Sequence, residues 1–99
     1  MTIEDWRAEI DAIDDELLRL LNERARLAIR VGETKRSAGL SVLDGERERE
    51  VIARARGANP GPLGADAVER LFRRIIEESR RAESHALEEA AAHAEGMLR

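Results

Sequence analysis

The sequence predicts an all-α protein of three helices, one long, one short and one long. Apolar residues recur at alternating steps of three and four along much of the chain, which is the spacing of one helix face. The chain of 99 residues has only two aromatic side chains, Trp6 and Phe72, and both prolines fall in one short stretch. We therefore expect an aliphatic core formed between helices.

The first helix is expected to begin after Thr2 and to end near Ala38. Thr2 is a good N-cap, and the acidic residues that follow it favour the helix dipole. Gly39 is the natural stop. A helix of roughly 35 residues is about 50 Å long. Its apolar face is expected to contain Trp6, Ile10, Ile13, Leu17, Leu20, Leu27 and Val31.

A second, shorter helix is expected from about Gly45 to Arg56, with Asp44 as its N-cap and Gly57 closing it. The stretch 57–64 is dense in glycine and proline, which predicts a loop.

A third helix should start near Ala65 and run into an alanine-rich tail that frays before Gly96. We expect residues 1–99 to be a single domain, with its core in about 3–87 and a frayed helical tail at 88–99.

The length of the first helix predicts assembly. A compact monomer of this size has a radius of gyration near 13 Å. The rest of the chain cannot cover the apolar side of a helix about 50 Å long. An intertwined homodimeric helical bundle is the simplest closed arrangement that buries the stripe from Trp6 to Val31. The alternative is an extended monomer.

Charged and polar residues interrupt the apolar faces of all three expected helices. Arg24 and Lys35, the chain's single lysine, continue the stripe of the first helix. Cations on a buried stripe are costly unless an anion meets them. The second helix offers Arg47 and Glu48 on its inward side, and the third offers Ser79 and Glu83. The coincidence favours an anionic small molecule as the guest.

Each of these residues also has a structural explanation. Arg24 could pair with a carboxylate across a helix interface, and Lys35 lies where a cation favours the helix dipole. The alternating charges around Arg47 and Glu48 are typical of a solvated face. Ser79 could bond back to a carbonyl one turn earlier.

Composition excludes several classes of function. The net charge of −4 argues against a partner that is nucleic acid or an anionic membrane. Cysteine is absent, and His85 and His93 lack ligand-like neighbours, so we expect no metal site and no cofactor. The acidic N-terminus is unlike a signal peptide, and no apolar run matches a membrane span. A cytoplasmic protein is expected.

Three segments in order resemble the all-helical chorismate mutases. The second helix contributes Asp44-x-x-Arg47-Glu48, and the third contributes Arg70-Leu-Phe72-x-x-Ile75-Ile76-Glu-x-Ser79. The resemblance covers roughly residues 4–84. The segment in the first helix reads Arg7-x-x-Ile10-x-x-Ile13-Asp14-x-x-Leu17-Leu18-x-Leu20-Leu21-x-x-Arg24, then Leu27-Ala28, Val31-Gly32 and Lys35.

The resemblance implies an isomerase that converts chorismate to prephenate in phenylalanine and tyrosine biosynthesis, as a dimer with two sites. Arg7 would reach into the partner's site and, with Arg24, hold the substrate's carboxylates. Lys35 would donate to the ether oxygen. Glu48 and the segment 44–47 would hold the ring hydroxyl.

Substrate binding by Asp44, Arg47 and Ser79 of the same chain is also implied by the resemblance. Glu83 stands where the family usually has glutamine, which puts the pH dependence in question. We expect Arg24, Lys35 and Glu83 to be catalytic.

Two other functions stay open on sequence grounds. One is a related lyase that removes pyruvate from isochorismate. The other is a non-catalytic helical dimerisation or regulatory module, in which the inward charges form salt bridges between helices. A partner enzyme of the same pathway is also conceivable.

Overall fold

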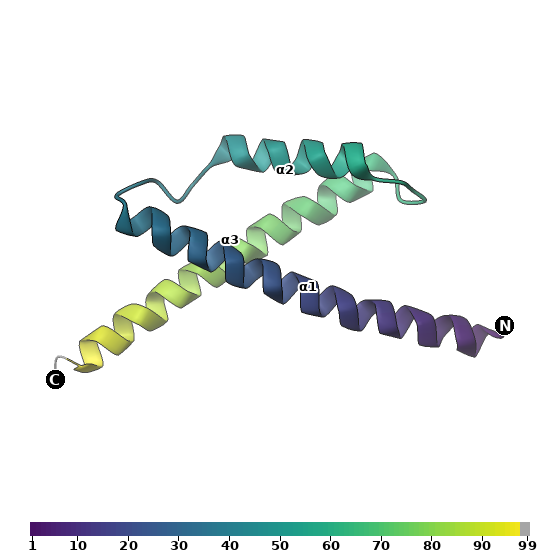
Figure 1. Ribbon diagram of the computed structural model, residues 1–99, viewed down its shortest axis with the longest axis horizontal. Coiled ribbons are helices and arrows are strands. Elements are labelled where there is room, and N and C mark those ends of the chain that lie inside the picture. Colours follow the sequence, from purple (N-terminus) through teal and green to yellow (C-terminus); the bar gives the residue numbers. More distant parts are fainter. Residues whose placement is uncertain (98–99) are drawn as a thin grey trace.

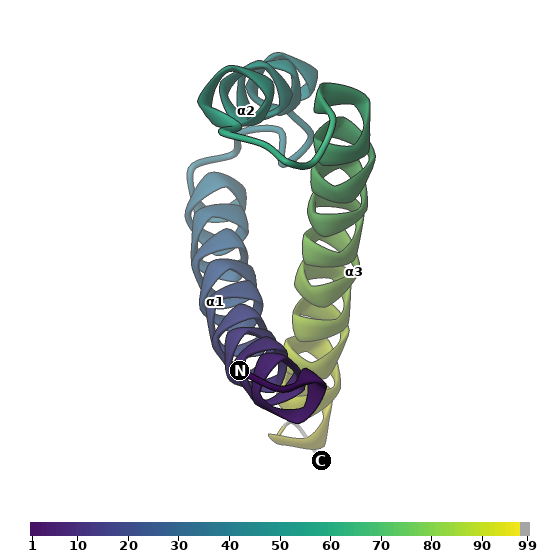
Figure 2. The ribbon, with the colours of Figure 1, turned by 90° about the vertical axis from the view of Figure 1, so that its right-hand side faces the viewer.

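The computed structural model describes residues 1–97 and confirms the all-α class. Its helices are α1 (Ile3–Ser37), α2 (Gly45–Ala58) and α3 (Ala65–Met97). The long helices α1 and α3 cross, and α2 lies on one side of the crossing (Figure 1). Helix α3 packs against both α1 and α2. A view turned by 90° shows α2 lying across one end of the α1–α3 pair (Figure 2).

Both ends of α1 form where the sequence predicts them. Thr2 and Asp5 make a reciprocal capping box, because the Thr2 hydroxyl accepts from the Asp5 N–H at 3.2 Å and the Asp5 carboxylate accepts from the Thr2 N–H at 2.8 Å. At the other end Gly39 has φ 73°, which suits glycine. The N–H of Leu40 donates to the Lys35 carbonyl at 2.8 Å, closing a Schellman motif.

The expected end of α2 at Gly57 is wrong. The helix continues through Gly57 to Ala58 because glycine tolerates the helical conformation at a modest cost. Asn59 then turns the chain: its amide donates to the Leu63 carbonyl at 2.7 Å, and its side-chain oxygen accepts from the Gly61 N–H at 3.1 Å.

The described part of α3 runs through Gly96 to Met97. Fraying of the tail stays a prediction. The last two residues of the expected tail, 98–99, lie outside the described residues.

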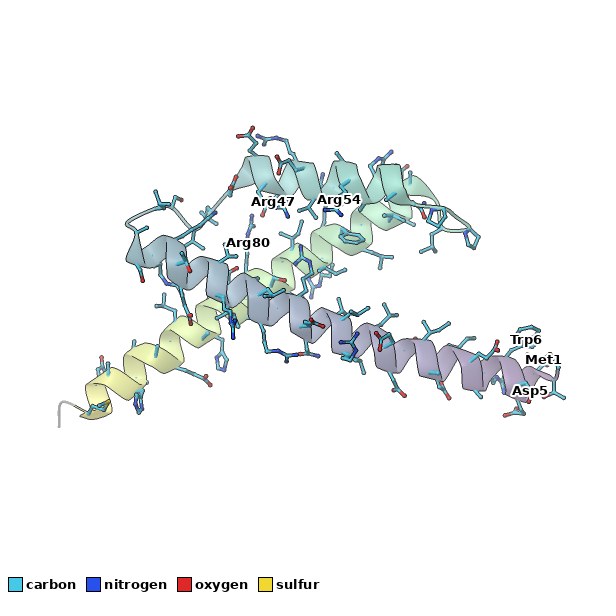
Figure 3. The ribbon with its side chains drawn as sticks, viewed as in Figure 1. Met1, Asp5, Trp6, Arg47, Arg54 and Arg80 are labelled. Atoms are coloured by element: carbon cyan, nitrogen blue, oxygen red, sulfur yellow. The ribbon has the colours of Figure 1, made fainter. Side chains whose placement is uncertain are left out.

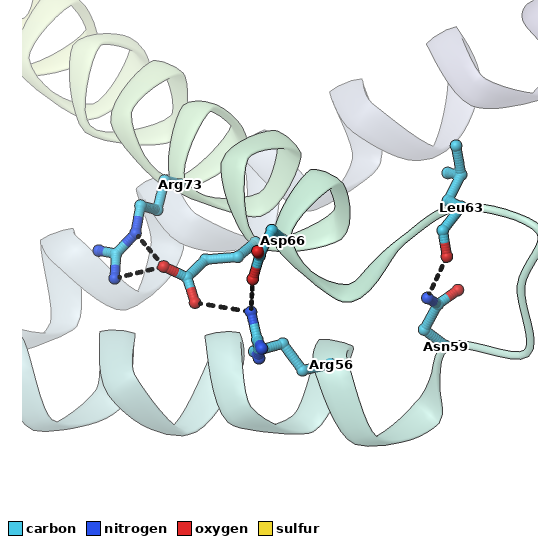
Figure 4. A network of polar contacts seen from close by, with 6 residues as sticks. Arg56, Asn59, Leu63, Asp66 and Arg73 are labelled. Atoms are coloured by element: carbon cyan, nitrogen blue, oxygen red, sulfur yellow. Dashed lines mark hydrogen bonds and ion pairs between the residues drawn. The ribbon is translucent and has the colours of Figure 1, made fainter.

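A charged clamp sets α2 against the start of α3. Arg56 Nη1 lies 2.9 Å from the Asp66 carboxylate and 3.3 Å from that of Glu69 (Figure 4). Glu69 in turn pairs with Arg73 on the next turn of α3, at 3.0 Å. Ile52 of α2 and Val68 of α3 are buried. The α2–α3 angle is therefore fixed by both ion pairs and apolar packing.

A single chain leaves most of its apolar surface uncovered. Its accessible surface is 8065 Å², whereas a compact monomer of 11.1 kDa exposes about 5,700 Å². The radius of gyration is 17.7 Å, against about 13 Å for a compact chain of this length. On α1, Trp6 is 53% exposed and Ile13 60%. No helix within residues 1–97 has the length and apolarity needed to cross a membrane.

Candidate active site

A cleft of about 290 Å³ lies between the second half of α1, the start of α2 and the middle of α3. Its floor is apolar and carries Leu27, Val31, Val51 and Ile76. Charged and polar groups from every helix project into it. They are Arg24 and Lys35 from α1, Asp44, Arg47 and Glu48 from the beginning of α2, and Ser79, Arg80 and Glu83 from α3.

Arg24 and Lys35 of α1 are held by a residue of α3 and by the N-cap residue of α2. Arg24 Nη1 donates to Ser79 Oγ at 3.0 Å, and Ser79 is only 8% exposed. Lys35 Nζ lies 3.5 Å from the carboxylate of Asp44. The Schellman motif after Lys35 turns the chain so that Asp44 comes back beside that amine. Two cations are thereby fixed three turns apart along one helix face.

Asp44 has two tasks in this cleft. As the N-cap of α2 its carboxylate accepts from the Arg47 N–H at 2.9 Å, and this hydrogen bond is the main reason that the Asp44 pKa lies below its usual value. The positive charge of Lys35 lowers the pKa further. Asp44 is therefore a carboxylate at neutral pH, and it anchors Lys35 at the rim.

Glu83 is the carboxyl group whose pKa is shifted in the opposite direction. Burial raises the Glu83 pKa, while the charges of Arg36, Arg80 and Lys35 act against that rise. Its carboxylate lies against buried Gly32 of α1, where a side-chain carbon would come within 3.1 Å of Glu83 Oε2. The missing side chain at residue 32 thus gives Glu83 its place in the cleft.

The cleft brings together seven of the predicted site residues, and one stays outside. Arg24, Lys35, Asp44, Arg47, Glu48, Ser79 and Glu83 all line it. Arg7 does not: it is 69% exposed near the free end of α1 and pairs with Glu4 at 3.2 Å. Its proposed action in a partner's site stays a prediction.

Arg80 is the charged cleft residue that sequence reasoning missed. It pairs with Glu48 across the space between α3 and α2. Its position four residues after Ile76 is the signal that could have placed it on the inward face of α3.

A second cavity of about 310 Å³ adjoins the cleft and is also cationic. Arg24, Arg47 and Arg54 line it together with Phe72 and Val51. Figure 3 shows Arg47 and Arg54 extending from α2 toward α3, with Arg80 reaching up from α3. Arginines gathered at one cavity attract carboxylates. Each planar guanidinium group can bind one carboxylate through two parallel hydrogen bonds. Within residues 1–97 no three metal-ligating side chains come together.

Comparison with known proteins shows the family of the chain. The family model for chorismate mutase type II matches residues 6–84. The chain belongs to the chorismate mutase type II family. It is similar to a solved chorismate mutase (form II) from Thermus thermophilus, with 36% identity and a TM-score of 0.81, over 83% of this chain and 93% of that one.

Two curated relatives are larger proteins. A bifunctional chorismate mutase/prephenate dehydratase from Aquifex aeolicus is 44% identical over 78 residues, which is 75% of this chain and 22% of the relative. The T-protein of Haemophilus influenzae is 37% identical over 78 residues, which is 78% of this chain and 21% of the relative. The chain thus spans about a fifth of the length of these two relatives.

Proposed function

We propose that the chain catalyses the rearrangement of chorismate to prephenate in phenylalanine and tyrosine biosynthesis. The observation that carries the proposal is the cleft in which Arg24 and Lys35 face Arg47, Glu48 and Glu83 over an apolar floor. Its cations suit a dicarboxylate, and its carboxyl groups suit a hydroxyl and an ether oxygen. Membership of the chorismate mutase type II family supports the same reaction.

Catalysis of this reaction requires a site of suitable shape and charge. One C–O bond breaks as one C–C bond forms within a single molecule, with no nucleophile and no proton transfer. The protein must hold the enolpyruvyl arm over the ring. It must also stabilise negative charge that grows on the ether oxygen. Both tasks fall to fixed cations and hydrogen-bond donors.

The charged and polar groups of the cleft other than Arg80 have roles in this scheme. Arg24, held by Ser79, binds a substrate carboxylate through its fork. Lys35, held by Asp44, donates to the ether oxygen as a compact charge. Glu83 in its neutral form supplies a second donor there.

The ring hydroxyl is assigned to the beginning of α2. Glu48 accepts a hydrogen bond from that hydroxyl. Asp44 and Arg47 fix the segment around it through the N-cap hydrogen bond.

The active form in this proposal is a homodimer. The uncovered stripe of α1 supplies the interface, and the partner's Arg7 completes each site by binding the second carboxylate. In the Aquifex relative named above, chorismate mutase is joined to prephenate dehydratase. The enzyme that consumes prephenate is therefore a candidate partner, and a cytoplasmic location stays part of the proposal.

The deciding experiment incubates the purified protein with chorismate and follows the loss of its absorbance, then identifies the product. Prephenate supports the proposal. Release of pyruvate from isochorismate, with no prephenate from chorismate, would instead identify a lyase. A folded dimer that leaves both compounds unchanged would indicate a non-catalytic module.

A further inference from the structure

Arg80 differs from the other arginines in the middle of α3. Arg73, Arg74 and Arg81 pair with carboxylates one turn away on the same helix. Arg80 instead reaches across to α2 and pairs with Glu48 (Figure 3). The local pairs are exposed to solvent, whereas the Arg80–Glu48 pair lines the cleft. The roles proposed above use Glu48 and leave Arg80 without one.

Glu48 needs such a partner for two reasons. It stands as a carboxylate in a cleft proposed to hold a dianion, so its charge opposes binding unless a cation offsets it. Its side chain is also long and only partly buried, so it has several rotamers to choose between. A guanidinium group answers both needs, since its charge offsets the carboxylate and its hydrogen bonds fix one oxygen.

We propose that Arg80 is a positioning residue that holds Glu48 across the α2–α3 gap, leaving the other carboxylate oxygen free to accept the substrate's ring hydroxyl. This inference rests on the proposed function. Arg80 acts through Glu48 and does not itself bind a substrate carboxylate. Selection for a hydroxylated ring then depends on an ion pair between helices as well as on Glu48.

The first test compares Arg80→Gln with the control Arg81→Gln. Both remove one arginine charge from adjacent positions of α3, but within residues 1–97 Arg81 pairs with carboxylates of its own helix, Glu78 at 2.8 Å and Glu77 at 3.8 Å. Arg80→Gln should raise KM for chorismate about ten- to a hundredfold, the range of a charge-assisted hydrogen bond, with a smaller change in kcat. Arg80→Lys should recover part of the loss because it restores the charge without the fork. Arg81→Gln should resemble the wild type.

The second test is a double-mutant cycle with Glu48→Gln, read on kcat/KM and on prephenate binding by calorimetry. If Arg80 acts through Glu48, then Arg80→Gln adds little once Glu48 is neutral. Equal losses in both backgrounds would show that Arg80 binds the ligand directly, which overturns the inference. A loss that follows only the unfolded fraction, measured by thermal unfolding, overturns it as well.

The two hypotheses fail in different ways. An active wild type whose Arg80→Gln and Arg81→Gln variants behave alike contradicts the role of Arg80 alone. A wild type that forms no prephenate from chorismate contradicts the proposed function.

Discussion

At the scale of single residues, Lys35 is the group on which the proposed chemistry depends most. It is the only lysine beside sixteen arginines, and it faces the cleft with Asp44 3.5 Å from its amine. A compact ammonium group concentrates charge at one atom, which suits an ether oxygen better than a planar guanidinium group does. The choice of lysine at this position therefore agrees with stabilisation of one developing charge.

Replacing Lys35 by methionine should remove that stabilisation and leave the fold intact. We expect kcat to fall about 10²- to 10³-fold, the cost of a lost oxyanion donor. The melting temperature should change little, because Asp44 is half-exposed and keeps its N-cap hydrogen bond. Arg30→Met is the matched control, since Arg30 lies on the exposed side of α1 away from the cleft. Near wild-type turnover by Lys35→Met would remove the core of the mechanism.

Glu83 should make activity depend on a proton that is never transferred. Only the neutral carboxyl can donate a hydrogen bond, and it is populated below the pKa of Glu83. Burial raises that pKa, against the opposing charges of Arg36, Arg80 and Lys35. We therefore expect kcat/KM to fall as pH rises through a pKa above the ordinary glutamic acid value, which a pH–rate profile measures.

The Glu83→Gln variant tests the same assignment. Glutamine keeps the shape and carries a permanent N–H donor, so the profile should become flat and activity should persist at high pH. A wild-type profile that is already flat from about pH 5 to 8, where an ordinary glutamic acid stays ionised, contradicts the role. A glutamine variant with an unchanged acid preference contradicts it equally.

Sequence periodicity found most cleft residues because they replace apolar ones at helical spacing. Arg24, Ser79 and Glu83 were visible in this way, and the structure brings them into one cleft. Arg80 was missed although it lies four residues after Ile76, because a charged residue in an Arg/Glu-rich helix resembles a solvated one. Its partner Glu48 lies on another helix, and this pairing cannot be read from spacing along the chain.

At the scale of elements, Gly32 of α1 makes room for the Glu83 side chain of α3. This glycine is buried inside the C-terminal part of α1, where it costs about 1 kcal/mol relative to alanine. A side-chain carbon there would lie 3.1 Å from Glu83 Oε2 and 3.5 Å from Arg36 Nη1. Glycine at this position therefore lowers the stability of α1 but allows Glu83 to lie close to it at the proposed site.

Gly32→Ala should separate stability from activity. The melting temperature should stay level or rise. We expect kcat/KM to fall about tenfold, because the new methyl group displaces Glu83 by less than the displacement of about 1 Å that can cost a hundredfold in rate. Gly57→Ala is the control: it lies inside α2 with nothing within 4 Å of an added side-chain carbon. It should raise stability by about 0.5–1 kcal/mol with unchanged kinetics. Equal kinetics in both variants would show that Gly32 does not position Glu83.

The helix ends show what local chemistry can and cannot predict. Thr2, Asp44 and Gly39 act as expected because each satisfies backbone groups within its own few residues. The prediction that α2 ends at Gly57 was wrong because glycine permits a helix to end but does not force it to. The end of α2 is set instead by the turn that Asn59 makes with the loop after it.

At the scale of the whole molecule, α1 has the charge pattern of a helix that pairs with a reversed copy. Residues 3–18 hold seven carboxylates and one arginine, whereas residues 19–37 hold six cations and two carboxylates. Two antiparallel copies would place each acidic half beside a basic half. The same pairing would cover the exposed apolar stripe that contains Trp6 and Ile13.

Placing a charge on that stripe should break the proposed dimer. Ile10→Glu is expected to sediment at about half the wild-type mass and to lose activity, because a carboxylate at the interface is not paired. Ala8→Glu adds the same charge on the opposite face of α1 and should remain dimeric and active. A wild type that sediments as a monomer at assay concentration would contradict the dimer itself.

Arg7 should act across the dimer interface. Since it does not line the cleft of its own chain, any role in catalysis must be in the partner's site. It pairs with Glu4 near the free end of α1 and is not among the residues that line the cleft with Lys35. Arg7→Ala and Lys35→Met chains should each be nearly inactive alone. After subunit exchange, a heterodimer has one site with an intact Lys35 and the partner's intact Arg7. A statistical mixture should therefore recover about a quarter of wild-type activity. If a mixture with confirmed exchange stays as inactive as its parents, the site is not shared between chains.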